Sequence, residues 1–353
     1  MKLSRLLVLS LGLTAGFACA DGVDYSSYSG TVWADGVTVD GGWYDANKTD
    51  NDESYIEVEY EDGTSENVGA DDNMCYAASS SNVIAWWQDR NPHLTTPSTP
   101  DYETIWKTYV DNNKEYNEGG ITSACINWWF SGVYLPESDE DWNRFYCDAD
   151  DMDVEEVKKN LETTTGHYYD QCNLNKSDLS ALIMDVWESP DLEEAAMAED
   201  DAQMSAYQLT LDFAKLFDEG CMISLGIASD DENNEIAHAI TLWGVEYKDG
   251  VLTKLWLTDS DDYELTLNPD TGEGTPTIFS ADVELDEDKN KIYITGTSHD
   301  KEGECFYGDG VYIADVNALN ASASANWQLV PEPTTATLSL LALAALATRR
   351  RRK

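Results

Sequence analysis

The sequence AHAITLWGVEYKDGVLTKLWLTDSD, residues 237–261, indicates two β-strands joined by a tight turn. Asp249-Gly250 lies between two apolar runs and is the strongest short signal for a two-residue hairpin turn. With this turn, His238 lies opposite Asp261 and diagonal to Asp259; a turn centred one residue earlier places Asp259 directly opposite. Because side chains alternate along a strand, both registers keep the two carboxylates on the face that carries His238. The hairpin therefore predicts a His–Asp pair.

A second stretch, DDNMCYAASSSNVIAWW at residues 71–87, indicates a loop that runs into a buried helix, with Cys75 at the junction. Apolar residues recur at helical spacing after residue 82, and residues 71–73 are good helix starters. A thiol in the first turn of a helix feels unpaired backbone N–H groups and the positive end of the helix dipole, which favour the nucleophilic thiolate. The alternative for this stretch alone is a small apolar cysteine at a helix start.

Cys75 and the His238 pair together supply what cysteine-based acyl transfer requires. An imidazole takes the thiol proton and returns it to the leaving amine, while a carboxylate fixes the imidazole tautomer. The other histidines, His93, His167 and His299, lack comparable carboxylate neighbours in the sequence. A satisfied core histidine and a zinc site are the alternatives for His238, but no second histidine or paired cysteine stands at zinc-ligand spacing. We therefore expect neither a metal nor a cofactor.

Helical periodicity dominates the middle of the chain, and strand periodicity dominates its later part. Apolar residues at three- and four-residue intervals predict helices at 102–110, 153–163, 177–187 and 202–218. Alternating patterns predict a hairpin within 55–60 and strands at 31–37, 221–227, 237–247, 251–258, 277–285, 292–297 and 310–315. Helices followed by an antiparallel sheet are typical of an α+β fold, and the change of period predicts a boundary between two lobes near residue 220.

The charge of the chain excludes two classes of partner. The sequence carries 68 acidic and 21 basic residues, for a formal net charge of −47. Such a surface repels nucleic acid and anionic membranes. The 12 Trp and 19 Tyr residues nevertheless indicate a packed core, not a disordered acidic chain.

Both ends of the sequence carry addressing signals. Residues 1–20 combine basic residues, an apolar run and the cleavage motif Ala18-Cys19-Ala20, as a secretory signal peptide does. Residues 329–353 contain Pro-Glu-Pro, an apolar segment and an arginine-rich tail, and resemble the PEP-CTERM sorting signal of Gram-negative bacteria. We expect a protein that is exported, processed by the sorting machinery and either held at the cell surface or secreted, with residues 21–328 as the mature domain.

Cysteine usage fits export, because oxidising compartments permit disulfides. Six cysteines remain after the signal peptide, and Cys75 must stay a free thiol if it is a nucleophile. The simplest expectation is two bridges and one further free cysteine. Cys125, Cys147 and Cys172 lie in one region and are favoured to pair among themselves, although spacing does not determine connectivity.

The chain resembles the IdeS/Mac family of papain-like, immunoglobulin-degrading bacterial cysteine endopeptidases in five short motifs spanning roughly residues 31–262. The motifs occur in the family's order: Val32-Trp33 with Gly36-Val37; Gly42-Trp43-Tyr44-Asp45 with Lys48-Thr49; Cys75 with Asn82 and Trp86-Trp87; His238 with Leu242-Trp243-Gly244; and Thr258-Asp259-Ser260-Asp261. Residues 95–200 match the family poorly.

The resemblance implies a role for each matching residue. Cys75 would be the nucleophile, His238 the base and Asp259 the carboxylate that orients it, with Asp261 assisting. Lys48 and the N–H of Cys75 would form the oxyanion hole, since a positive donor stabilises charge that develops on the carbonyl oxygen. The fold implied is papain-like α+β, with a helical lobe led by the Cys75 helix up to about residue 220 and an antiparallel sheet lobe over 221–316.

Together these observations predict an exported cysteine endopeptidase that acts on extracellular proteins through an acyl-enzyme thioester. Immunoglobulin as substrate is an implication of the resemblance, and host glycoproteins are implied by the sorting signal. Two other functions remain open. An acyl transferase of the transglutaminase type uses the same three side chains, and a non-catalytic surface binding protein could retain the fold.

Overall fold

The computed structural model of the chain describes the parts that build the core and the candidate site. The described residues are 23–46, 48, 55–59, 65–69, 74–96, 99–113, 122–131, 172, 181–189, 204–231, 236–262, 276–300 and 306–329.

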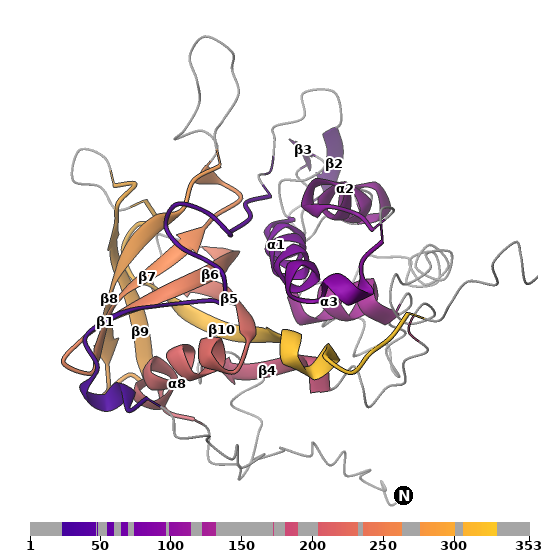
Figure 1. Cartoon of the computed structure of the whole chain (residues 1–353). Coiled ribbons are helices and arrows are strands. Elements are labelled where there is room, and N and C mark those ends of the chain that lie inside the picture. The colour runs from indigo at the N-terminus through magenta and orange to yellow at the C-terminus, as the bar shows by residue number, and fades with distance from the viewer. Residues whose placement is uncertain are drawn as a thin grey trace, which may run out of the picture.

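A closed antiparallel β-barrel forms the centre of the molecule (Figure 1). Six strands follow one another around the ring in the order β6, β5, β10, β9, β8 and β7, and β7 pairs again with β6. β1 extends the sheet beyond β6, and β4 pairs with β10. A separate hairpin joins β2 to β3. The strands are β1 (Gly30–Trp33), β2 (Tyr55–Glu59), β3 (Ser65–Gly69), β4 (Ile183–Glu188), β5 (Cys221–Ser229), β6 (Ala237–Lys248), β7 (Val251–Thr258), β8 (Phe279–Asp286), β9 (Lys291–Thr297) and β10 (Val311–Asn320).

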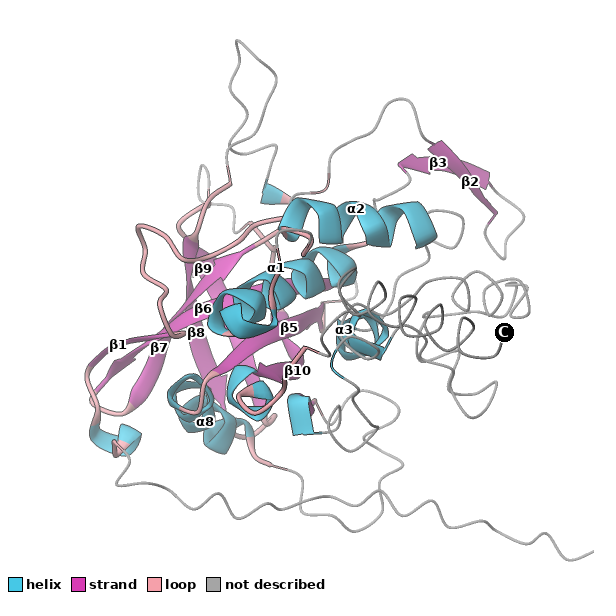
Figure 2. Ribbon diagram, turned by 45° about the vertical axis from the view of Figure 1, so that its right-hand side comes forward, coloured by secondary structure: helices cyan, strands magenta, loops and turns pink. Residues whose placement is uncertain are grey.

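Four α-helices are described: α1 and α8 pack on the barrel, and α2 and α3 pack on α1 (Figures 1 and 2). α1 (Cys75–Arg90), α2 (Tyr102–Asn113) and α3 (Thr122–Ser131) gather on one side, where α1 contacts β5 and β6. α8 (Ala206–Asp218) packs against β1, β5, β6 and β7. Short 3-10 helices occupy Tyr25–Ser27, Pro92–Leu94 and Ala321–Ser324.

The predicted papain-like α+β fold with two lobes is wrong. The barrel is the finding that overturns it, because strands from both sides of residue 220 share one sheet. β1 pairs with β6, and β4 pairs with β10, although both precede the expected boundary. α8 covers barrel strands and is not part of a helical lobe. Periodicity identifies single elements well, but it does not show that β6 and β7 also close a ring.

One predicted helix is in part a strand. The range 177–187 was expected to be helical, but β4 occupies Ile183–Glu188. Ile183, Val186 and Trp187 satisfy helical spacing, yet β-branched and aromatic residues also suit a strand, and pairing with β10 decides the outcome. The predicted helix at 153–163 lies outside the described residues. The helices at 102–110 and 202–218 are confirmed, the latter as α8, with Ser205 capping its first turn.

α1 is buried almost all round, from Tyr76 to Gln88, which confirms the predicted buried helix. Its small polar residues face the barrel. The Ser79 hydroxyl lies 2.8 Å from that of Ser224 on β5 and donates to the Ile240 carbonyl of β6 at 3.0 Å. Asn82 donates to the Thr241 hydroxyl at 3.1 Å. These buried hydrogen bonds specify how the helix lies on the barrel, since a misplaced helix would leave them unmade.

The described cysteines are free thiols: Cys75, Cys125, Cys172 and Cys221. With four of the six unpaired, the expectation of two disulfides is wrong, and Cys125 and Cys172 are not bridged. Cys147 lies outside the described residues, as do the predicted signal peptide and residues 330–353 of the predicted PEP-CTERM segment. Within the described ranges, no helix has the length and apolar character needed to cross a membrane.

Candidate active site

The β6–β7 hairpin places His238 beside Asp259, as its sequence predicts. Asp249 and Gly250 form the two-residue turn, with φ of 52° and 80°, the left-handed conformation that a type I′ turn requires. Lys248 pairs with Val251 next to the turn, and Thr241 pairs with Thr258 at the far end. His238 Nε2 then lies 2.6 Å from Asp259 Oδ1, just beyond the last residue of β7.

Two irregularities within this hairpin cancel each other. The pairing register shifts by one residue between Leu242 and Gly244, where β6 holds an extra residue. It shifts back between Glu246 and Tyr247, where Thr253 is the extra residue on β7. Because a one-residue slip turns every side chain to the opposite face, the second shift restores the facing of His238 and the acidic loop.

Cys75 is the first residue of α1 and is half-buried. It forms a hydrogen bond with His238 and receives another from the backbone of Ala239. Burial raises the pKa of the thiol, but His238, the charge of Lys48 and the Ala239 hydrogen bond together lower it, and the net pKa lies below the ordinary value. Met74 is the N-cap residue before α1, and its side chain makes no capping hydrogen bond to the helix.

The charge state of His238 complements that of Cys75. Burial lowers the pKa of the imidazole, whereas Asp259 and the Cys75 thiolate raise it, and the net pKa lies well above the usual histidine value. Since Nε2 is bonded to Asp259, Nδ1 is the nitrogen left for the thiol. The pair therefore favours thiolate and imidazolium, the reactive form of a cysteine nucleophile.

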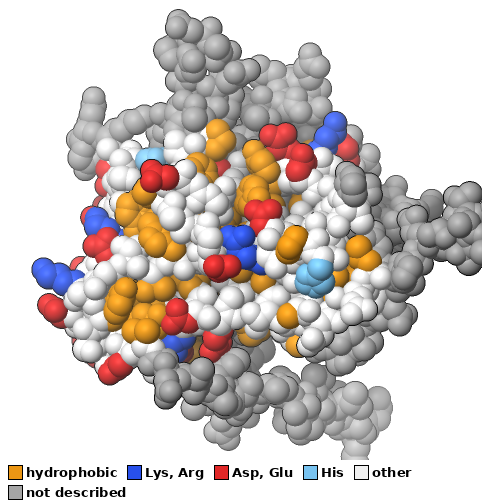
Figure 3. Space-filling view, viewed as in Figure 1, with side chains coloured by type: hydrophobic (Ala, Val, Ile, Leu, Met, Phe, Trp, Pro, Cys, Tyr) orange, Lys and Arg blue, Asp and Glu red, His pale blue; other side chains and the backbone are white. Residues whose placement is uncertain are grey.

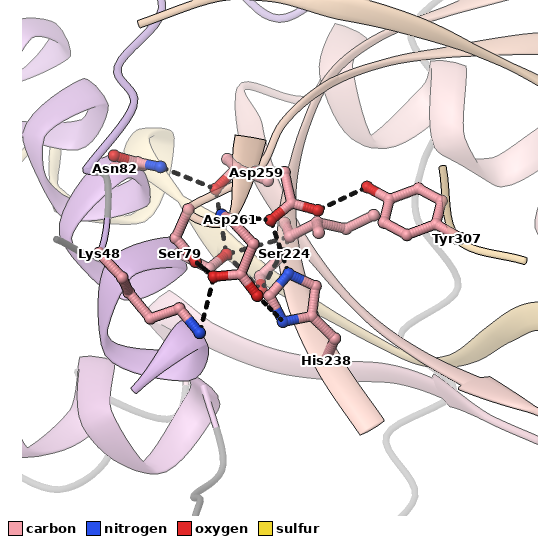
Figure 4. Close-up of polar contacts among 11 residues, drawn as sticks. Lys48, Ser79, Asn82, Ser224, His238, Asp259, Asp261 and Tyr307 are labelled. Atoms are coloured by element: carbon pink, nitrogen blue, oxygen red, sulfur yellow. Dashed lines mark hydrogen bonds and ion pairs between the residues drawn. The ribbon is translucent and has the colours of Figure 1, made fainter. Parts of the chain in front are cut away.

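Asp259 has a third partner that sequence reasoning missed. The buried Tyr307 hydroxyl donates to Asp259 Oδ2 at 2.7 Å, and the N–H of Asp261 donates to Oδ1 at 2.9 Å (Figure 4). Burial raises the pKa of Asp259, but His238 and these donors lower it, and the net pKa is below the ordinary value. Tyr307 lies in a turn just before β10, 48 residues from Asp259, and no local pattern links the two.

Lys48 reaches the site on an extended segment, here called the Lys48 segment (residues 44–46 and 48). Its backbone bonds to the barrel and to α1: Tyr44 O accepts from Thr258, Ala46 N donates to Asn82 and Lys48 N donates to Ser260. The Lys48 ammonium pairs with Asp261 Oδ1 at 2.7 Å and is near enough to Cys75 to lower the thiol pKa. Figure 4 shows Lys48 pointing toward Asp261.

Asp261 stands between two cationic groups. One carboxylate oxygen binds Lys48, and the other lies 3.7 Å from His238 Nδ1. The structure thus brings together all five predicted residues, Cys75, His238, Asp259, Asp261 and Lys48. On the face seen in Figure 3, basic and acidic side chains lie side by side between hydrophobic patches.

Metal binding is a second chemistry to consider for the same side chains. The donor atoms of His238, Asp259 and Asp261 lie within 4.8 Å of one another. However, Asp259 already bonds His238, Tyr307 and a backbone N–H, and Asp261 pairs with Lys48. A hydrogen-bonded carboxylate–imidazole–thiol series fits proton transfer better than ligation.

The other described histidines lie apart from this arrangement. His93 is exposed in the Pro92–Leu94 turn, and His299 stacks on Phe279 at 4.3 Å. His167 lies outside the described residues. Within the described ranges, the thiol–imidazole–carboxylate series is therefore built on His238, the residue the hairpin predicted.

The chain was compared with known proteins. No protein-family model and no curated protein matches it.

Proposed function

We propose that this protein is a cysteine endopeptidase of the IdeS/Mac type that cleaves extracellular proteins. One observation carries the proposal: Cys75 is hydrogen-bonded to an imidazole whose other nitrogen binds a buried carboxylate, and the thiol pKa is lowered despite burial. A structural cysteine in the same degree of burial would have a raised pKa. The five motifs shared with that family support the same chemistry independently of the geometry.

In the proposed reaction, the Cys75 thiolate attacks the carbonyl carbon of a peptide bond. The carbonyl oxygen takes the electron pair and becomes an oxyanion. His238 gives its proton to the leaving amine, the C–N bond breaks and a thioester remains on Sγ. His238 then takes a proton from water and the hydroxide attacks the thioester carbonyl; the C–S bond breaks, which regenerates the Cys75 thiolate and releases the acid product. Asp259 stays ionised and stabilises the imidazolium throughout.

Lys48 is the candidate stabiliser of the oxyanion, together with the N–H groups of the first turn of α1. Burial lowers the pKa of Lys48, but Asp261 and Cys75 raise it, and the net pKa is above the ordinary value, so the ammonium stays charged. A fixed positive charge beside the thiolate is placed where negative charge moves during attack. Asp261 holds that charge in position at 2.7 Å while no substrate is bound.

The substrate and the location of the protein are proposed from sequence features. The signal peptide and the PEP-CTERM segment support export to the cell surface or beyond. The family resemblance supports immunoglobulin as the first substrate to try, with mucus or other host glycoproteins as the next class.

The first experiment is alkylation with limiting iodoacetamide near pH 6, followed by peptide mass mapping of wild type and His238→Ala. We expect selective labelling of Cys75 that falls about 100-fold in the variant, because the imidazolium no longer stabilises the thiolate. His93→Ala is the matched control, since His93 is exposed and remote from the site, and it should label as wild type does. Labelling of Cys75 that is slow, or equal in the two proteins, would remove the basis of the proposal.

Activity is tested with purified immunoglobulin G and with denatured proteins, in water and with an added primary amine. Cleavage that depends on Cys75 supports the endopeptidase. Amine incorporation without cleavage would instead establish an acyl transferase of the transglutaminase type.

A further inference from the structure

Two more carboxylates lie beside the triad, and the proposed reaction uses neither. Asp45 belongs to the Lys48 segment and is 3% exposed, and Asp262 follows Asp261 and is 0% exposed. One residue holds both of them. The Thr277 N–H donates to Asp45 Oδ2 at 3.2 Å, and the Thr277 hydroxyl donates to Asp262 Oδ2 at 2.7 Å. Thr277 therefore connects the Lys48 segment to the loop that carries Asp259.

Each carboxyl group has one oxygen left over. Asp45 Oδ1 and Asp262 Oδ1 are buried and have no hydrogen-bond partner among the described residues. A buried ionised carboxylate with one oxygen left unsatisfied is disfavoured in such a place, and two neighbouring ones are worse. A proton on one carboxyl group turns an unmatched acceptor into a donor. If one of the two carboxyl groups retains a proton, the repulsion between two buried negative charges is avoided.

Electrostatics support this assignment. Burial, and then the charge of Asp262, raise the pKa of Asp45 well above its ordinary value. Burial is the main cause that raises the pKa of Asp262, to about 7, and Asp259 and Asp261 add to it.

The groups that face the pair offer little positive charge. Asp259 and Asp261 approach from the same loop, Tyr102 from α2 and Tyr307 from the turn before β10. His299, after β9, approaches Thr277 Oγ1 to 3.4 Å with its Nε2. The named neighbours are therefore mainly acidic or phenolic, and they do not compensate a second negative charge.

We propose that Asp45 and Asp262 are positioning residues that share one retained proton near neutral pH, and that this singly protonated pair holds the Lys48 segment against the Asp259–Asp262 loop. Loss of the proton leaves two buried negative charges, one on the Lys48 segment and one on the Asp259–Asp262 loop. Their repulsion moves Lys48 away from Cys75. The proposal deepens the proposed function, because it concerns how Lys48 and Asp259 are held, but its tests need no peptide substrate.

The first test measures the rate of Cys75 alkylation by iodoacetamide from pH 5.5 to 8.5 in wild type, Asp262→Asn and Asp45→Asn. Asparagine has one acceptor and one donor group, and so resembles the protonated carboxyl. We expect the ratio of wild-type to variant rate to be near one at pH 5.5 and to fall to about one third at pH 8.5, where only wild type has lost the proton. A ratio that does not change with pH overturns the positioning role. If one variant does not fold, the other provides the same ratio.

Asp315→Asn is the matched control. Asp315 is a β10 residue whose pKa is also raised to about 7, chiefly by burial, but its hydrogen-bond partners in the described structure are Asn317 and the Gly226 N–H, and not the triad. The ratio of the wild-type alkylation rate to that of Asp315→Asn should remain near one at every pH. A ratio for Asp315→Asn that falls in parallel with that of Asp262→Asn would also overturn the proposal, because the effect would then be general.

The second test detects the proton itself. Infrared difference spectra are recorded in the Asp315→Asn background, so that Asp315 contributes no protonated carboxyl band. We expect a protonated-carboxyl band at pH 6 that disappears on further Asp45→Asn and Asp262→Asn substitution. Absence of that band at pH 6 overturns the shared proton. This readout is independent of catalysis: a failure of the proposed function appears as unreactive Cys75 or uncleaved protein, with the band still present.

Discussion

The start of α1 and the start of α3 each carry a cysteine, and the pKa values of the two thiols are shifted in opposite directions. Cys75 is the first residue of α1, and its pKa is lowered. Cys125 is close to the start of α3 and is 2% exposed, and burial raises its pKa far above the ordinary value. Both positions feel a helix N-terminus. The pKa values differ because His238 and Lys48 lie beside Cys75 and not beside Cys125. Charged neighbours, not the helix end, determine which thiol is reactive.

The largest effect is expected when each of the two cysteines is replaced by serine in a separate variant. Cys75→Ser should abolish iodoacetamide labelling at pH 6 and lower any peptidase activity by on the order of 10⁴-fold or more, since it removes the nucleophile. Cys125→Ser should leave the labelling of Cys75 unchanged. Mass mapping of both variants measures this, and appreciable labelling of Cys125 in native wild type would contradict the comparison.

Lys48→Met tests the second charge that separates the two thiols. We expect kcat to fall about 100-fold, because a stabiliser of the oxyanion is lost, while the alkylation rate falls only severalfold, since His238 remains. Lys254→Met is the matched control, because Lys254 forms an ion pair with Asp282 on the barrel surface at 2.7 Å. Equal losses of kcat and alkylation rate would show that Lys48 acts on the thiol and not on the oxyanion.

Tyr307→Phe removes one donor to Asp259 while keeping the ring. A hydrogen bond to a charged acceptor contributes about 1.5–3 kcal/mol, so we expect a drop of about tenfold in kcat and a shift in the pH profile of Cys75 alkylation. Tyr293→Phe is the control, because its hydroxyl bonds Asp230 at 2.5 Å and not Asp259. A pH profile identical to that of wild type would reduce Tyr307 to a packing residue.

The smallest expected effect comes from a second comparison, between the buried carboxyl groups of Asp259 and Asp315. Like the pKa values of the two thiols, their pKa values are shifted in opposite directions. His238 and Tyr307 lower the pKa of Asp259 against burial, whereas burial raises the pKa of Asp315 to about 7. Asp315 therefore binds more protons when folded than when unfolded, so the free energy of unfolding falls as pH rises from about 4 to about 7. Asp315→Asn should remove that decline, with a gain of about 1–2 kcal/mol at pH 8 and none at pH 4. Thermal unfolding at both pH values measures it, and an equal gain at both would contradict the assignment.

Local pattern was sufficient for the elements that carry the triad. Asp249-Gly250 specifies the hairpin turn, alternation places His238 and Asp259 on one face, and apolar residues at helical spacing after residue 82 indicate the helix that delivers the thiol. These features depend on residues within about two dozen positions of one another. Cys75, His238, Asp259 and Asp261 were predicted for this reason, whereas Lys48 was predicted only from the resemblance to IdeS/Mac peptidases.

Features that depend on distant pairing were not predictable in the same way. β4 has side chains that suit both helix and strand, and only its pairing with β10 decides between them. Closure of the barrel through β6 and β7 is a property of the whole sheet. Tyr307 and the Thr277-linked pair of Asp45 and Asp262 meet their partners across long sequence separations, where periodicity carries no information.

The Lys48 segment has a consequence for the order of events during synthesis. Tyr44 and Lys48 bond to Thr258 and Ser260, so contacts that place the ammonium span more than two hundred residues of chain. A growing chain that ends before residue 258 holds Cys75 but has neither Asp259 nor the Thr258 and Ser260 contacts that help to hold the Lys48 segment. Its thiol is then an ordinary one, since long loops close late and only once their distant partner exists. We therefore expect selective alkylation of Cys75 only in the finished fold, and not in a chain that is truncated before residue 258.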